Sequence, residues 1–288
     1  MKSYSFFAGC TIPNVIPSIE AATRRVMEKL GIELVDLPFG CCPDPTGVQG
    51  LSHDAWLVLG ARNIALAEQE GKGDIMTICN GCFETLKTVN HHVREDPKER
   101  EMINSHLQKV NRKIEGKLDV RSFLEVLEED IGLEEIKKHI TTPLDQTVGI
   151  HYGCHILKPK EILKYDNPDR PERIERLLEA LGIKTKQYVN KSLCCGAGIL
   201  GIDGQTTLGI RREKLVEVEK AGIDWLVTPC PTCLRGYDSS QMMIKKEFGD
   251  NLNIPVLHIS ELLALVMGFP ANEIGLNFHR VKDPSWKK

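Results

Sequence analysis

The chain alternates short apolar runs with longer segments in which apolar residues recur every three or four positions. The apolar runs predict β-strands at residues 3–8, 32–37, 75–79, 117–121, 147–152, 184–189, 225–229 and 254–259. The periodic segments predict helices at residues 18–30, 54–70, 83–94, 121–130, 171–181, 206–221, 234–247 and 259–267. Because strands that alternate with helices favour parallel pairing with right-handed crossovers, the pattern predicts an α/β fold.

The second half of this pattern repeats the first. "LGARNIALAEQEGKGD" at 59–74 matches "LGIRREKLVEVEKAGID" at 208–224, and "TICNGC" matches "TPCPTC" shortly after each. A repeat of this length indicates two copies of one folding unit, and we divide the chain into residues 1–142 and 143–288. A charged segment, 94–116, interrupts the first copy, and we expect it to be mostly helical with a solvated face.

Charge and hydropathy narrow the class of protein. The 37 basic and 40 acidic side chains give a net charge of -3, so no charged field favours nucleic acid or a membrane surface. The N-terminus lacks the features of a secretory signal. The most apolar stretch, 261–270, is about half as long as a membrane span requires. We therefore expect a cytoplasmic protein with no membrane span, whose cysteines stay reduced.

The cysteines change this picture most. All ten fall into two sets of five with one order: a single cysteine, an adjacent pair and a C-x-x-C motif. The first set is Cys10, Cys41, Cys42, Cys79 and Cys82, and the second is Cys154, Cys194, Cys195, Cys230 and Cys233. Adjacent Cα atoms lie about 3.8 Å apart, which is below the usual disulfide separation of about 4.4–6.8 Å. Each pair is therefore better suited to ligation or redox chemistry.

The predicted topology brings each set together. In both copies the single cysteine and the C-x-x-C motif follow a predicted strand directly, and the pair comes a few residues after one. Loops at the carboxyl ends of parallel strands share one edge of the sheet, where open α/β folds bind ligands. Both C-x-x-C motifs lead into a helix, whose amide donors and dipole stabilise thiolates. Five thiols per unit are expected to converge at this edge.

Three kinds of site use such thiols. A structural zinc and a cubane iron-sulfur cluster each take four ligands, so each would leave one thiol per unit unused. A centre that accepts five thiolates, with one bridging two irons, fits the count better. Iron-sulfur centres are therefore favoured, while one or two zinc sites and free redox thiols stay open.

The cysteine pattern, with "FFAGCTIPN", "CCPDPTG", "TICNGC", "HYGCH" and "CCGAG", resembles the B subunit of heterodisulfide reductase from methanogenic archaea. The resemblance runs through essentially the whole chain and includes the family's cysteine-rich "CCG" pattern. It implies two tandem α/β units, each holding a noncubane [4Fe-4S] cluster through its own five cysteines. Pro43 replaces the glycine of the pattern in the first copy, and Gly196 keeps it in the second.

The resemblance implies the reduction of the mixed disulfide of coenzyme M and coenzyme B to the two thiols. Because that substrate carries a sulfonate, a carboxylate and a phosphate, cations near the cysteine loops are candidates to bind it. They are Lys158, Arg211 and Arg235, followed by Lys160, Arg62 and Arg212. His155 is the candidate proton donor to a departing thiolate, and His151, inside a predicted strand, is a weaker candidate.

The electrons must come from partner proteins, because the chain has neither a nucleotide-binding glycine loop nor a three-cysteine ferredoxin run. The resemblance implies the C subunit of heterodisulfide reductase, with ferredoxin-like iron-sulfur clusters, and its A subunit, with FAD and iron-sulfur clusters, joined to a hydrogenase or a formate dehydrogenase. Two other functions stay open. One is an iron-sulfur subunit of a glycolate, lactate, fumarate or succinate oxidoreductase, and the other is a zinc-bound scaffold without catalysis.

Overall fold

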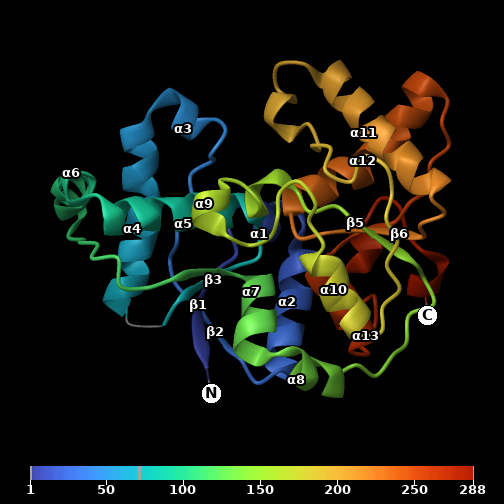
Figure 1. Ribbon diagram of the computed structural model, residues 1–288, viewed down its shortest axis with the longest axis horizontal. Coiled ribbons are helices and arrows are strands. Elements are labelled where there is room, and N and C mark those ends of the chain that lie inside the picture. The colour runs from blue at the N-terminus through green and yellow to red at the C-terminus, as the bar shows by residue number, and fades with distance from the viewer. Residues whose placement is uncertain (1, 71–72, 288) are drawn as a thin grey trace.

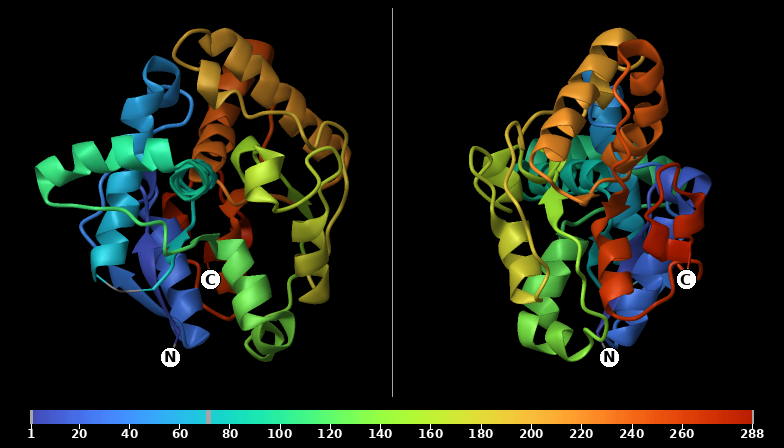
Figure 2. Two further views of the ribbon diagram at one scale, coloured as in Figure 1. Left: turned by 60° about the vertical axis from the view of Figure 1, so that its left-hand side comes forward. Right: turned by 90° about the vertical axis from the view of Figure 1, so that its right-hand side faces the viewer.

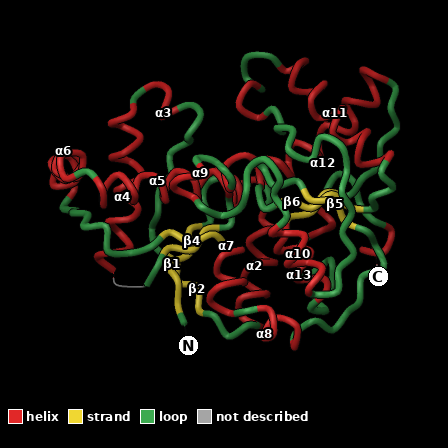
Figure 3. Tube along the Cα trace, viewed as in Figure 1, coloured by secondary structure: helices red, strands yellow, loops and turns green. Residues whose placement is uncertain are grey.

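Two parallel sheets form the framework of the molecule, which is seen in a computed structural model that describes residues 2–70 and 73–287 (Figures 1 and 3). The first sheet has the order β2-β1-β3-β4 and the second the order β5-β6-β7. The strands are β1 (Ser3–Phe7), β2 (Glu33–Asp36), β3 (Ile75–Thr77), β4 (Val120–Ser122), β5 (Val148–Ile150), β6 (Trp225–Thr228) and β7 (Val256–His258). The α/β fold of two tandem units with parallel sheets is confirmed.

The predicted helices are present, each within a few residues of its expected ends. The α-helices are α1 (Thr11–Val15), α2 (Pro17–Lys29), α3 (Val48–Leu51), α4 (His53–Glu70), α5 (Asn80–Glu95), α6 (Pro97–Leu107), α7 (Phe123–Glu125), α8 (Leu133–Lys138), α9 (Lys160–Leu163), α10 (Arg173–Ala180), α11 (Gly204–Lys220), α12 (Pro231–Phe248) and α13 (Ile259–Val266). A π-helix, η2 (Val126–Ile131), continues α7, and short 3-10 turns include η3 (Cys154–Ile156) and η4 (Ala197–Ile199). The short helices α1, α3, α8 and α9 had no sequence signal that we recognised.

One predicted strand is wrong. Residues 184–189 reduce to a single bridge between Val148 and Thr185, whereas their counterpart β2 pairs with β1 over four residues. The Tyr188 hydroxyl donates instead to the Ile150 carbonyl at 3.0 Å. A side chain thus takes the place of a backbone hydrogen bond that a neighbouring strand would make with β5. The chain then turns toward Lys214, whose ammonium binds the carbonyl oxygens of Asn190 and Lys191. Hydrogen bonds from the side chains of Tyr188 and Lys214 therefore hold this segment where strand pairing was expected.

The two units exchange their closing helices. After β7, α13 packs against α2 of the first unit, and the right-hand view of Figure 2 shows the C-terminal segment beside the N-terminal one. After β4, the segment α7–η2 lies against the second unit, where Arg173 pairs with Glu128 at 2.8 Å and Glu129 at 2.7 Å. Buried apolar side chains from both halves form one continuous core. This shared core fixes the position of one unit against the other.

The insert in the first unit forms α6, which packs on α4 and α5 at the left of Figure 1. Asp96 caps it by accepting from the amides of Lys98 and Glu99. Among the helices formed by residues 2–70 and 73–287, none has the length and apolar character that crossing a bilayer requires.

Candidate metal centres

The five thiols of the first set line one small cavity of about 90 Å³. The thiols of Cys10 and Cys41, Cys41 and Cys42, Cys42 and Cys82, and Cys82 and Cys79 are near enough to shift one another's pKa. Cys41 is exposed and Cys42 is buried, so the adjacent side chains point different ways, as an extended pair should. Hydrogen bonds from neighbouring thiols lower the pKa of Cys42 to about 5. The predicted gathering of the first set is present.

The second set repeats this arrangement around a larger cavity of about 640 Å³. Cys154 interacts with Cys194, Cys194 with Cys195, Cys195 with Cys233, and Cys233 with Cys230. Again the first cysteine of the pair is exposed and the second is buried. The Gly196 amide donates to Cys194 Sγ at 3.3 Å, and this contact and the hydrogen bond from Cys154 help to lower the pKa of Cys194.

A glycine with positive φ precedes the single cysteine in each unit. Gly9 has φ +76°, and a Cβ there would lie 2.9 Å from Cys82 Sγ. Gly153 has φ +75°, and a Cβ there would lie 2.9 Å from Asn80 Nδ2 and 3.6 Å from Cys233 Sγ. The backbone therefore approaches the Cys82 sulfur at Gly9, and the Asn80 amide at Gly153, as closely as only glycine permits. Each site is lined by cysteine sulfur atoms and lies beside glycine backbone that carries no side chain.

The two C-x-x-C motifs meet where the units join. Cys79 caps α5 and Cys230 caps α12, and their thiols are close enough to hydrogen bond to each other. Asn80 Nδ2, at the start of α5, donates across the junction to the Tyr152 carbonyl at 2.7 Å. The cavities also share four wall residues, namely Asp44, Pro45, Gly81 and Thr232. The ten thiols thus line two adjacent cavities that share part of their wall.

His155 lies in the wall of the larger cavity, on η3. Its Nδ1 is 3.9 Å from Oε2 of Glu84, a buried carboxyl on α5 of the first unit. Burial raises the pKa of Glu84 to about 7, and the negative charges of Cys42 and Asp44 act in the same direction. Glu84 was missed because nothing in a helical sequence shows that this carboxylate faces the other unit. Together the two residues can hold a proton at the cavity wall.

The candidate cations lie elsewhere. Among the residues that the structure describes, no lysine or arginine lines the larger cavity. Arg211 is buried and donates to the Cys195 carbonyl at 3.0 Å and to Ser240 Oγ at 2.9 Å, so its guanidinium supports the protein rather than facing a ligand. Lys158 is exposed just beyond η3, and Arg235 lies in a separate surface hollow beside Val15 and Phe278.

The weaker candidates are also placed by the structure. Arg62 lies beside Gly40, Lys160 is exposed at the start of α9, and Arg212 pairs with Asp250. His151 is buried directly after β5, against the ring of Tyr237. Among the described residues, no group hydrogen bonds either of its ring nitrogens.

The donor set fits an iron-sulfur centre. Each cavity is walled by five sulfur donors, beside a glycine cradle where a side chain would obstruct the approach. A structural zinc would use four of the five. Within residues 2–70 and 73–287, the buried His151 ring and Tyr237 hydroxyl have no hydrogen-bond partner, and both are influenced by thiols of the second set. A sulfide-rich group bound there would offer acceptors.

Comparison with known proteins gives consistent results. The family model of the CCG cysteine-rich domain matches residues 4–87 and 148–236. The chain is 37% identical, over 98% of its length and 95% of the relative's, to the B subunit of a ferredoxin/F420H2-dependent CoB-CoM heterodisulfide reductase from Methanosarcina acetivorans. It is 31% identical, over 98% of both chains, to an 8-methylmenaquinol:fumarate reductase membrane anchor subunit from Wolinella succinogenes.

A solved structure shares the fold. A hypothetical protein from Helicobacter pylori superimposes with a TM-score of 0.78 and 17% identity, over 99% of this chain. The chain spans 53% of the length of that protein. At this identity the likeness concerns the fold alone, and it agrees with the two-unit architecture described above.

Proposed function

Because the chain belongs to the family of the heterodisulfide reductase B subunit, with two cysteine-rich CCG domains, we propose that it is the catalytic subunit of such a reductase. Its reaction is the reduction of the coenzyme M-coenzyme B mixed disulfide to the two thiols in methanogenesis. The observation that carries the proposal is the pair of five-thiol cavities that share part of their wall. A disulfide bound at that shared wall would lie beside both sites.

We propose that each site holds one noncubane [4Fe-4S] cluster. The first is bound by Cys10, Cys41, Cys42, Cys79 and Cys82, and the second by Cys154, Cys194, Cys195, Cys230 and Cys233. When bound, two such clusters supply the two electrons of disulfide cleavage one at a time. The protein contributes the fixed spacing, because Cys79 and Cys230 begin the helices α5 and α12 where the units join. The thiolates gain further stability from the amide ends of α5 and α12.

Proton delivery is assigned to His155. A thiolate that leaves at the wall of the larger cavity takes a proton from the imidazole, which is half-buried and lines that wall. The Glu84 carboxylate, whose Oε2 lies 3.9 Å from Nδ1, orients the ring and balances the positive charge of the protonated imidazole. Ala197 and Ile202 add apolar groups to the lining of the same cavity.

Lys158 and Arg235 remain proposals for the anionic ends of the substrate, which extend beyond the thiol-lined space. Lys158 is exposed, three residues after His155 and just beyond η3. We propose that electrons arrive from the C and A subunits of heterodisulfide reductase, with an associated hydrogenase or formate dehydrogenase, in the cytoplasm. The relatives named above are themselves reductase subunits.

A second candidate follows from the Wolinella relative, which is a subunit of a fumarate reductase. In that role the chain would pass electrons to another subunit, and its larger cavity would hold no disulfide. The two candidates differ in one property, which is whether the isolated iron-loaded complex forms thiols from the mixed disulfide.

The test is an anaerobic assay of the purified complex with the coenzyme M-coenzyme B heterodisulfide and a reduced dye. Thiol release, with iron and sulfide bound, supports the proposal. Iron-loaded complex that releases no thiol but reduces fumarate supports the second candidate. Zinc without iron would establish the scaffold instead.

A further inference from the structure

Two cations are buried beneath the second cysteine set. Lys214, on α11, is fully buried, and its Nζ donates to the carbonyl oxygens of Asn190 and Lys191, both at 2.7 Å. Arg211, one turn earlier, holds the Cys195 carbonyl. Within the described part of the chain, neither cation lies within ion-pair distance of a carboxylate.

A buried charge is costly unless a charge of opposite sign faces it. Burial lowers the pKa of Lys214 to about 7, and the negative charges that oppose this are those of Cys233, Cys195 and Cys194, followed by Glu213. The ring of Tyr188, 5.5 Å from Nζ, adds a weaker attraction. Lys214 is therefore suited to a site that carries negative charge, such as a thiolate-bound cluster.

The first unit lacks a counterpart of Lys214. The repeat places Ala65 at that position, and the buried residues on either side, Ile64 and Leu66, are apolar too. Arg62 takes the position of Arg211, but it is only partly buried, beside Gly40. A buried carboxyl, that of Glu84, acts on Cys42. Two buried cations thus lie beside the second site, whereas a buried carboxyl and a partly exposed arginine lie beside the first.

We propose that Lys214, supported by Arg211, makes the second site electrostatically more positive than the first, so that a cluster there is reduced at a higher potential. This inference rests on the proposed function, since it requires a cluster in each site. Electrons that enter through the first site then collect at the second, which faces the larger cavity. Lys214 touches no reacting atom and acts through its field alone.

The experiment is a redox titration of the iron-loaded protein, followed by EPR. Lys214→Gln removes the charge but keeps donors for the two carbonyl oxygens, and Lys214→Met removes both. Lys220→Met, an exposed change on the same helix, is the matched control. A Cys194→Ser, Cys195→Ser double variant supplies the spectrum of the first site alone.

In Lys214→Gln the ratio of reduced to oxidised cluster at the second site should fall about tenfold at a fixed potential, a shift of about 59 mV for one electron. The first site and Lys220→Met should stay unchanged. An iron-loaded Lys214→Gln protein that titrates like the wild type, or whose two sites shift equally, would overturn the inference. Wild-type protein that binds no iron would refute the proposed function instead, so the two failures are distinct.

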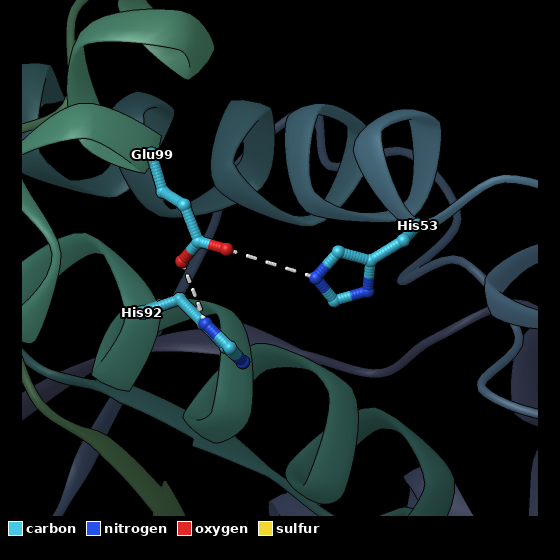
Figure 4. A group of neighbouring side chains, drawn as sticks. All are labelled: His53, His92 and Glu99. Atoms are coloured by element: carbon cyan, nitrogen blue, oxygen red, sulfur yellow. Dashed lines mark hydrogen bonds and ion pairs between the residues drawn. The ribbon is translucent and has the colours of Figure 1, made fainter.

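A separate group of donors lies where the start of α4, the last turn of α5 and the first turn of α6 meet (Figure 4). His53 begins α4, His92 lies in the last turn of α5, and Glu99 lies in the first turn of α6. His92 Nδ1 is 2.7 Å from Glu99 Oε2, and His53 Nε2 is 3.8 Å from Glu99 Oε1. One donor atom from each residue lies within 4.8 Å of the other two.

Two imidazoles and a carboxylate are a donor set that zinc and similar divalent ions use, with bonds of about 2.0–2.2 Å. The ring of His53 stacks on Trp56 at 5.7 Å, which fixes its orientation. All three side chains are partly exposed, so water can complete the coordination. We propose that these three residues bind one divalent ion of the zinc class, which joins the insert helix α6 to α4 and α5.

Equilibrium dialysis of the iron-loaded protein against micromolar Zn²⁺ tests this second proposal. One zinc per chain should bind, with only nitrogen and oxygen neighbours in X-ray absorption spectra at the zinc edge. His92→Ala and His53→Ala should each weaken binding about tenfold or more, whereas His91→Ala, next to the group, should not. Sulfur neighbours around zinc, or no zinc bound at micromolar concentration, would overturn the proposal.

Discussion

The two units hold their five thiols in nearly the same way but surround them with different residues. In both, a glycine of positive φ precedes the single cysteine, the pair has one exposed and one buried thiol, and the C-x-x-C caps a helix. Beside the first set lie Glu84, the partly buried Arg62 and an alanine in place of the lysine, and beside the second lie the buried Lys214, Arg211 and His151. The repeat has therefore preserved the binding site, while its surroundings have diverged and make the two sites chemically unequal.

The largest effect is expected from the paired cysteines themselves. Cys42→Ser and Cys195→Ser should each lose about half of the bound iron, because each removes a ligand from one site only. Disulfide reduction should be abolished in both. Iron analysis and EPR of the anaerobic proteins measure this. If either change removes iron from both sites, the two sites do not bind iron independently. They can then no longer be compared as separate sites.

The next largest effect is expected at the residue directly after the single cysteine, which differs between the two units. His155→Gln in the second unit should slow thiol formation about a hundredfold, because the proton donor is lost, with iron content unchanged. Thr11 holds the equivalent position in the first unit. Thr11→Val should leave the rate close to that of the wild type. Equal losses in both variants would contradict a specific role of His155 as the proton donor.

The glycine cradles give a smaller, matched pair of effects. Gly9→Ala and Gly153→Ala place a Cβ 2.9 Å from a neighbour at a positive φ, and each should cost about 1–3 kcal/mol of unfolding free energy. Gly31 and Gly182 also have positive φ but face open space. Alanine at these two positions should cost about 1 kcal/mol from backbone strain alone and spare the iron. Chemical denaturation with iron analysis measures the difference.

The smallest effect concerns pH. Glu125 and Glu261 close equivalent capping boxes, but Glu125 pairs with Lys87 at 2.8 Å and Glu261 pairs with His279 at 3.0 Å. Burial opposes both charges of the second pair. The attraction between them outweighs it, lowering the pKa of Glu261 and raising that of His279.

The stability that His279 contributes is complete below its ordinary pKa of about 6.5 and is lost as the pH rises through its raised value. That of Glu261 is present above about pH 4.5 and is lost as the pH falls through its lowered value. The melting temperature should therefore fall between about pH 6 and pH 8 in the wild type and less so in His279→Gln. The same fall in both would show that this pair is not its source.

Sequence patterns accounted for most of the framework and for the membership of the cysteine sets. Strong periodicity located the long helices, and the repeated words located the two units and all ten thiols. The predicted strand at 184–189 does not form, because the Tyr188 side chain bonds to the edge of β5 and Lys214 holds the segment that follows. The positions of both side chains depend on the rest of the fold. A short helix such as α9, which buries Leu163 and packs against α5, depends on tertiary contacts that periodicity over four residues cannot reveal.

The linear chain by itself determined what each site is made of, since ligand type and spacing are local properties of sequence. Only the tertiary structure decided how the sites face each other, because Glu84 approaches His155, and Cys79 approaches Cys230, across the junction of the units. A signal for Lys214 was present, namely a lysine on the buried face of α11 shared by Arg211 and Leu215. Its meaning required three dimensions, because a buried charge can be interpreted only when the charges around it are known.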